Sequence, residues 1–109
     1  MTNPAEEIQT EFAQAQKARA NNNEGQARVC ARRAAGIAIR DYLVRRGIRP
    51  PSRSAHDLLT LIKEHTALPP DLKQVADHLT LRVTEEFKLP IEADLVAESK
   101  MLCDWLLKN

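Results

Sequence analysis

The chain has few aromatic residues and few glycines, and these shortages argue against several kinds of ligand site. Aromatic residues make up 4% of the sequence, too few for the stacking platform that typical binders of single-stranded nucleic acid use. The three glycines form no glycine-rich phosphate loop and no dinucleotide fingerprint, and no Ser/His/Asp order appears. We therefore expect no cofactor.

Cysteine and histidine are also scarce. Cys30 and Cys103 lie in helical patterns without CxxC spacing, so we expect free thiols; a disulfide would need facing helices and an oxidising compartment. The three histidines make no zinc-type cluster with them, so no metal site is expected. No apolar run approaches the ~20 residues that cross a bilayer, and the acidic N-terminus is not a secretory signal. These features predict a cytoplasmic protein that does not enter a membrane.

The charges nearly balance, but the arginines are concentrated in one stretch. A formal net charge of +1 provides no overall field that would attract nucleic acid. Eight arginines nevertheless fall between residues 28 and 53. Arg28, Arg32 and Arg46 share one side of a helical wheel, and Arg33 and Arg40 share another. They form either solvated faces that pair with carboxylates or a phosphate-binding strip, because guanidinium groups grip phosphate bidentately.

Apolar residues recur at helical spacing, and no strand-like alternation persists. The pattern predicts five helices: one from the Asn3 cap and Pro4 to a turn at 21–25, one over about 24–46, one after the Ser54 cap, one from about 70 through Val83 and toward Phe87, and one over about 92–107. The second is apolar on most sides, which indicates a central position. We expect a single domain, residues 1–109, with an all-α, antiparallel up-and-down bundle of four to five helices.

One charged residue of the second predicted helix, Asp41, is expected to need a partner of opposite charge. Asp41 lies on a core-facing side of the second helix, and a charge there is costly unless it is paired. It can pair with Arg45 one turn on, or across the bundle with Arg82. Arg82 and Glu86 flank the apolar stripe of the fourth helix, and His78 precedes Arg82 by one turn. The alternatives are an ordinary Asp41–Arg45 pair with His78 on a solvated face, or a polar pocket between the second and fourth helices.

The stretch from Arg28 to Leu59 resembles the HEPN family, small all-α domains tied to nucleotide handling and RNA cleavage. The resemblance rests on a long Ala/Arg-rich helix that ends at Gly47, a loop with two prolines, and the sequence Ser54-Ala55-His56-Asp57-Leu58-Leu59. It covers roughly residues 25–107. It implies a HEPN-like bundle that pairs as a homodimer through its long helices. Surplus apolar residues on the second and last predicted helices point to the same pairing.

Enzymatic members of this family look like ribonucleases with an Arg on the penultimate long helix and a His a few residues later. Arg82 stands at the corresponding place, but Val83 to Pro90 contain no His, so the usual general acid/base is missing. The resemblance therefore implies a noncatalytic module that binds a nucleotide, RNA or a partner protein such as a minimal nucleotidyltransferase. The alternatives are a metal-independent ribonuclease of toxin type and a purely structural interaction protein.

Overall fold

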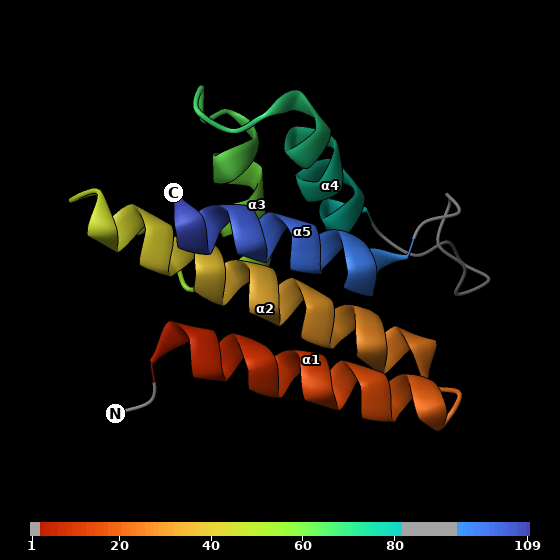
Figure 1. Ribbon diagram of the computed structural model, residues 1–109. Coiled ribbons are helices and arrows are strands. Elements are labelled where there is room, and N and C mark those ends of the chain that lie inside the picture. Colours follow the sequence, from red (N-terminus) through yellow and green to blue (C-terminus); the bar gives the residue numbers. More distant parts are fainter. Residues whose placement is uncertain (1–2, 82–93) are drawn as a thin grey trace.

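The computed structural model describes residues 3–81 and 94–109, and the elements in these residues are all helices. They are α1 (Pro4–Ala20), α2 (Glu24–Arg45), α3 (Ala55–Lys63), α4 (Pro70–Thr80) and α5 (Leu95–Lys108). Figure 1 shows α1, α2 and α5 lying alongside one another, with the shorter α3 and α4 set steeply across them. The prediction of an all-helical bundle is confirmed.

Polar side chains fix where four of the helices begin. Asn3, Asn23, Ser54 and Asp94 each accept a hydrogen bond from a backbone N–H two or three residues further on. Such caps satisfy N–H groups that the helix itself leaves without an acceptor. At the other end of α2, Gly47 has a φ of 75°, a left-handed conformation that glycine adopts at little cost. The predicted caps at Asn3 and Ser54 and the glycine after the second helix are therefore confirmed.

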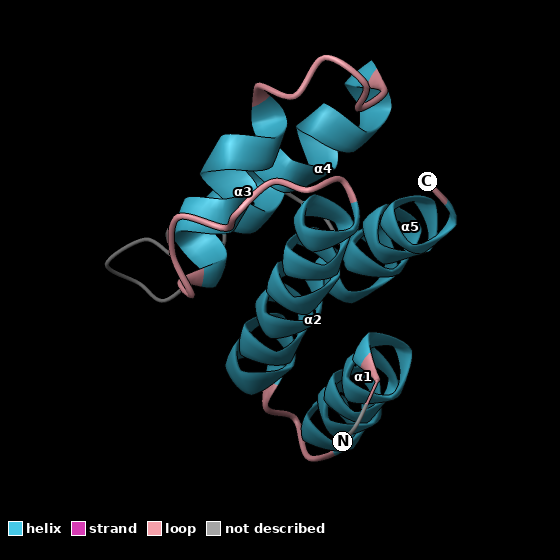
Figure 2. Ribbon diagram, turned by 90° about the vertical axis from the view of Figure 1, so that its left-hand side faces the viewer, coloured by secondary structure: helices cyan, strands magenta, loops and turns pink. Residues whose placement is uncertain are grey.

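The central helix is α2, as its sequence predicted. Its alanines Ala27, Ala31, Ala34, Ala35 and Ala38 are fully buried, and α1, α3 and α5 all pack against it. Figure 2 shows α2 between these three helices. Small side chains let the neighbouring helices come close. The buried face of α2 therefore joins the neighbouring helices into one core.

One close approach to α2 occurs at Gly36. A Cβ atom at Gly36 would lie 3.1 Å from the Cβ of Ala55, which is tighter than ordinary van der Waals contact. Ala55 is the first residue of α3. Glycine therefore lets the start of α3 rest against the backbone of α2, and this contact positions the loop before α3.

The helix directions depart from a strictly alternating bundle. A short turn reverses the chain between α1 and α2 (Figure 1). By contrast, α5 runs parallel to α2: the Ser99 hydroxyl donates to the Ala31 carbonyl oxygen at 2.8 Å, and further along both helices Arg45 donates to the carbonyl oxygen of Leu106. The predicted up-and-down order thus holds for α1 and α2 but not for α2 and α5, because α3 and α4 cross over between them.

The fourth helix is shorter than its apolar pattern predicted. It ends at Thr80, and Leu81 has an extended backbone, with φ −65° and ψ 141°. The Arg32 guanidinium donates to the carbonyl oxygens of Leu79 at 2.8 Å and of Leu81 at 3.3 Å. A cation at this position satisfies carbonyl groups that the last helical turn leaves free. The prediction that the helix continues unbroken toward Phe87 is therefore wrong at Leu81.

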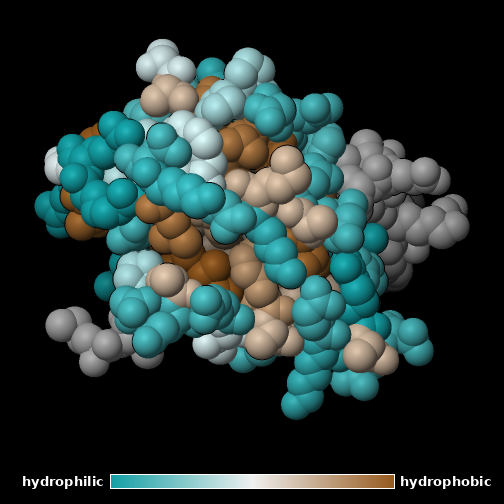
Figure 3. All heavy atoms as spheres, viewed as in Figure 1, coloured by the Kyte–Doolittle hydropathy of each residue, from teal (hydrophilic) through white to brown (hydrophobic). Residues whose placement is uncertain are grey.

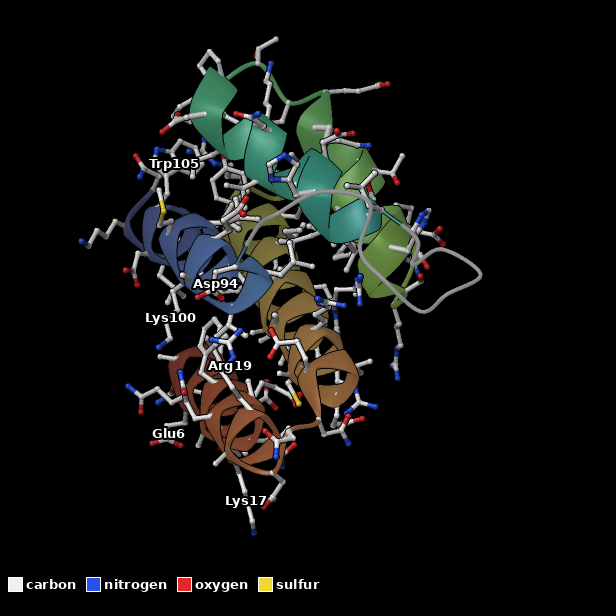
Figure 4. All side chains as sticks on the ribbon, turned by 90° about the vertical axis from the view of Figure 1, so that its right-hand side faces the viewer. Glu6, Lys17, Arg19, Asp94, Lys100 and Trp105 are labelled. Carbon is white, nitrogen blue, oxygen red and sulfur yellow. The ribbon has the colours of Figure 1, made fainter. Side chains whose placement is uncertain are left out.

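One charged network ties the ends of three helices together. Arg19, near the end of α1, approaches Glu24 at the start of α2 to 2.7 Å and Asp94, the cap of α5, to 3.0 Å. Figure 4 shows the Arg19 side chain reaching toward Asp94. Hydrogen bonds from Arg19 lower the pKa of both carboxyls.

No helix in the described part of the chain is both long and apolar enough to pass through a bilayer.

Candidate anion-binding site

Asp41 is paired with Arg45, which is the first of the two partners, Arg45 and Arg82, that the sequence allowed. The Nε of Arg45 donates to Oδ2 of Asp41 at 2.8 Å, one turn away on α2. Arg45 also reaches the carbonyl oxygen of Leu106, so it links α2 to the end of α5. Asp41 borders a cavity on the α1 side of α2 together with Glu7 and Arg40. The Asp41–Arg45 pair is therefore a structural contact at the margin of the core.

His78 is paired with a carboxylate rather than exposed on a solvated face. Its Nδ1 lies 2.7 Å from Oε1 of Glu98, and both side chains are only about one fifth exposed, at 22% and 20%. This pair joins α4 to α5, whereas Asp41 borders α1. The structure therefore does not bring Asp41 and His78 into one pocket. The expectation of a solvated face for His78 is wrong.

The other two residues of the predicted pocket, Arg82 and Glu86, lie outside the described residues. The described contact between α2 and the end of α4 is made by Arg32, through its bonds to Leu79 and Leu81. Burial and the nearby charge of Arg28 lower the pKa of Arg32. Arg32 therefore caps the C-terminal end of α4. The guanidinium N–H groups that bond to Leu79 and Leu81 are not free to bind an anion.

A different set of arginines surrounds a cavity of about 260 Å³ where α1, α2 and the start of α3 meet. We call this cavity the basic groove. Arg33 and Arg40 are seven residues apart on α2, close to two helical turns, so they project from the same side of that helix. Arg53 enters from the loop directly before the Ser54 cap of α3. The residues that line the basic groove are Glu11, Arg33, Gly36, Ile37, Arg40, Arg53 and Ala55.

The three arginines of the basic groove have no partner among the described residues. Arg33, Arg40 and Arg53 make no hydrogen bond or ion pair with any described residue. Arg19 and Arg45, by contrast, are held by carboxylates. Because no described partner neutralises them, the three guanidinium groups keep their full capacity to bind an anion.

The lining of the basic groove carries a net positive charge. Among the described residues that line it, Glu11 is the only acidic one, so the three arginines leave an excess of two positive charges. The start of α3 adds to this charge, since a helix N-terminus carries partial positive charge. The backbone N–H groups of Ala55 and His56 have no acceptor among the described residues. The groove therefore combines guanidinium forks with free backbone donors.

A second cavity, of about 360 Å³, lies between α1 and α5 and is mainly apolar. We call it the apolar groove; it is lined by Ala5, Ile8, Gln9, Phe12, Lys100, Cys103, Asp104 and Leu107. Figure 3 shows apolar atoms gathered between α1 and α5 on this face. Burial raises the pKa of the Cys103 thiol to about 12, so this cysteine is a poor nucleophile near neutral pH. The apolar groove therefore exposes apolar side chains but offers no reactive thiol.

The sequence provided part of the signal for the basic groove. The spacing of Arg33 and Arg40 placed them on one side of the second helix and raised the possibility of a phosphate-binding strip. Arg53 was not assigned to that strip, because its position depends on the contact between Gly36 and Ala55. A loop arginine directly before a helix cap is the signal that would have found it.

The described residues, 3–81 and 94–109, contain no group of three or more His, Cys, Asp or Glu side chains that could hold a metal ion. Comparison of the chain with protein-family models, with curated proteins and with solved structures finds no match.

Proposed function

We propose that this chain is a noncatalytic, HEPN-like module that binds a phosphate-bearing ligand, a nucleotide or an RNA, through the basic groove. The observation that carries the proposal is the presence around one cavity of three arginines, Arg33, Arg40 and Arg53, that have no partner among the described residues. Like charges that are brought together without a counterion repel one another, and a bound anion relieves that repulsion. Phosphate is the common biological anion whose geometry matches guanidinium forks.

Binding without catalysis follows from the same lining. Cleavage of RNA without a metal uses a general acid/base, most often a histidine. The described residues that line the basic groove include no His or Cys, and Glu11 is the only carboxylate among them. The ribonuclease alternative depends on Arg82, and no described contact favours it. We therefore expect purified protein to leave RNA intact under metal-free conditions.

Fluorescence anisotropy with a labelled single-stranded RNA, together with calorimetric titration with AMP, tests the proposal. The double variant Arg33→Gln/Arg40→Gln is expected to weaken binding of both probes by at least tenfold. The matched control is Lys17→Gln/Lys108→Gln, which removes the same charge from exposed positions outside the groove lining; Figure 4 shows Lys17 pointing away from the bundle. Equal losses in the two double variants would mean that the groove has no special role.

The salt dependence supplies a second criterion. Each phosphate contact with a single strand contributes about −0.7 to the slope of log K against log salt. If the three arginines contact three phosphates, the slope should be about −2, which is about a 20-fold loss of affinity between 50 and 200 mM salt. If all three contact a single phosphate, the slope should be about −0.7. A slope near zero would contradict phosphate binding by these arginines.

We also propose that the protein is a homodimer that pairs through the surface around the apolar groove. Met101 on α5 is 53% exposed. Lys100 and Asp104 provide both signs of charge one turn apart on the groove's rim, a pattern that can pair with its own copy across a two-fold axis. Light scattering should give twice the mass of 12.3 kDa, and Met101→Asp should restore the monomer. A monomer mass for the unaltered chain would refute the dimer. It would leave a partner protein, such as a minimal nucleotidyltransferase, as the occupant that the family resemblance implies.

A further inference from the structure

We infer that the basic groove recognises a terminal phosphate monoester and discriminates against an internal phosphodiester. This inference rests on the proposed function and narrows it, because it states which part of a nucleotide or RNA enters the groove. Three features carry it: the local charge, the number and placement of the donors, and the size of the cavity.

The charge of the groove matches a dianion. Three arginines and Glu11 leave an excess of two positive charges in the lining. A phosphate monoester carries about −1.5 to −2 at pH 7, because its second pKa is near 6. An internal phosphodiester keeps only one negative charge per phosphate. The monoester therefore neutralises the groove, whereas a single diester leaves it positive.

The donors come from different directions and suit a group with three terminal oxygens. Arg33 and Arg40 are about 10 Å apart along the axis of α2, from the rise of 1.5 Å per residue. Arg53 and the start of α3 supply donors from a second element, including the N–H group of Ala55, which has no acceptor among the described residues. A monoester presents three strong acceptor oxygens, while a diester has only two that are not bridging. Donors from several elements can engage all three.

The cavity is large enough for a phosphate end, and its described lining offers no platform for the base of a nucleotide. Its volume of about 260 Å³ lies below the ~300–1,000 Å³ of sites that enclose drug-sized ligands. The contact between Gly36 and Ala55 joins α2 to α3 along the cavity. No aromatic side chain is present among the described residues that line it, so these residues hold no base by stacking. We expect the sugar and base to remain outside the groove.

A first experiment compares three ligands that differ in phosphate chemistry: AMP, the cyclic diester 3′,5′-cyclic AMP, and adenosine. Calorimetric titration at pH 7.5 should show AMP binding at least tenfold more tightly than cyclic AMP and no binding of adenosine. Arg53→Gln should remove the preference for AMP. Equal affinity for AMP and cyclic AMP would overturn the inference.

The pH dependence provides an independent readout. Lowering the pH from 7.5 to 5 leaves about one tenth of a monoester as the dianion, given its second pKa near 6, so AMP affinity should fall about tenfold. Glu11 lies in the groove lining, and Glu7 and Asp41 share a second cavity with Arg40. His56 and Asp57 lie in the first turn of α3, close to Arg53 in the sequence. Cyclic AMP meets the same side chains but keeps one charge, so its affinity should change much less. Equal pH profiles would contradict selection of the dianion.

The source of the monoester is distinguished with two 3′-labelled RNAs of one sequence, one with a 5′-phosphate and one with a 5′-hydroxyl. Tighter binding of the 5′-phosphate RNA by at least tenfold would identify an RNA end as the ligand, and AMP binding without that preference would identify a free nucleotide. A third outcome is that the two RNAs bind the unaltered protein equally, that the Arg33→Gln/Arg40→Gln variant binds neither, and that AMP does not bind. In that case the proposed function stands and the inference is wrong. If no phosphate ligand binds, both are wrong.

Discussion

Arg32 provides the sharpest test of how the bundle is held together. It reaches from α2 to the end of α4, where its guanidinium donates to the carbonyl oxygens of Leu79 at 2.8 Å and of Leu81 at 3.3 Å. We predict that Arg32→Met destabilises the protein. Methionine keeps the apolar stem of the side chain and removes only the charged donors.

The expected cost follows from these two contacts. A hydrogen bond from a charged donor contributes about 1.5–3 kcal/mol, and the longer bond to Leu81 should contribute less than the one to Leu79. A cation at a helix C-terminus adds about 0.3–1 kcal/mol. In the opposite direction, burial and the charge of Arg28 disfavour the protonated guanidinium, and the substitution removes that penalty. We therefore expect a net loss of about 2 kcal/mol in the free energy of unfolding.

Urea denaturation measured by tryptophan fluorescence can detect this loss. Trp105 is the only tryptophan and packs against Tyr42, with ring centroids 5.7 Å apart, so its emission should report unfolding. With an m-value of about 1–3 kcal/mol/M, the midpoint should fall by about 1 M. The neighbouring exposed Arg33 is the matched control, and Arg33→Met should change the free energy by less than about 0.5 kcal/mol. A similar small effect for Arg32→Met would refute its role as the cap of α4.

Three further predictions concern other contacts. Arg19 lowers the pKa of Asp94, so the ionised Asp94 carboxyl stabilises the fold above its unfolded pKa. That stability is lost as the pH falls through the lower folded pKa. Arg19→Gln should therefore cost about 0.5–1 kcal/mol at pH 7 and flatten the decline of stability below pH ~4, as measured by urea midpoints across pH. Tyr42→Phe removes the hydroxyl that lies 2.9 Å from Nε2 of His65 and should cost about 0.5–1.5 kcal/mol by thermal unfolding. Cys103 is buried and its pKa is raised to about 12, so it should react with a thiol reagent at pH 8 only after unfolding; rapid labelling of the folded protein would show that the cysteine is accessible.

The parts of the fold that depend on local sequence were predictable. The caps at Asn3 and Ser54 involve residues within one turn, and the apolar spacing identified α2 as the central helix. The parallel direction of α5 was not predictable, because it results from the crossing of α3 and α4. The end of α4 at Thr80 was also hidden, since Arg32, 47 residues earlier along the chain from Leu79, satisfies its last carbonyls.

The contacts of the candidate site also divide into those that local sequence predicts and those that depend on tertiary packing. The Asp41–Arg45 pair was predictable from its spacing of one helical turn. The His78–Glu98 pair was not, because it joins two helices whose packing no local pattern specifies. Arg53 belongs to the basic groove only because the glycine in α2 lets α3 approach closely. Side chains that meet through tertiary contacts therefore required the structure.

An NMR titration of ¹⁵N-labelled protein with AMP tests the central claim most directly. The arginine Nε–H signals of Arg33, Arg40 and Arg53 should shift together and saturate with one dissociation constant, along with the backbone amides of Ala55 and His56. The Nε–H signal of Arg32, which already donates to Leu79, should stay in place. Shifts at Arg32 without shifts at the three groove arginines, or no saturable shift at any arginine, would contradict the account.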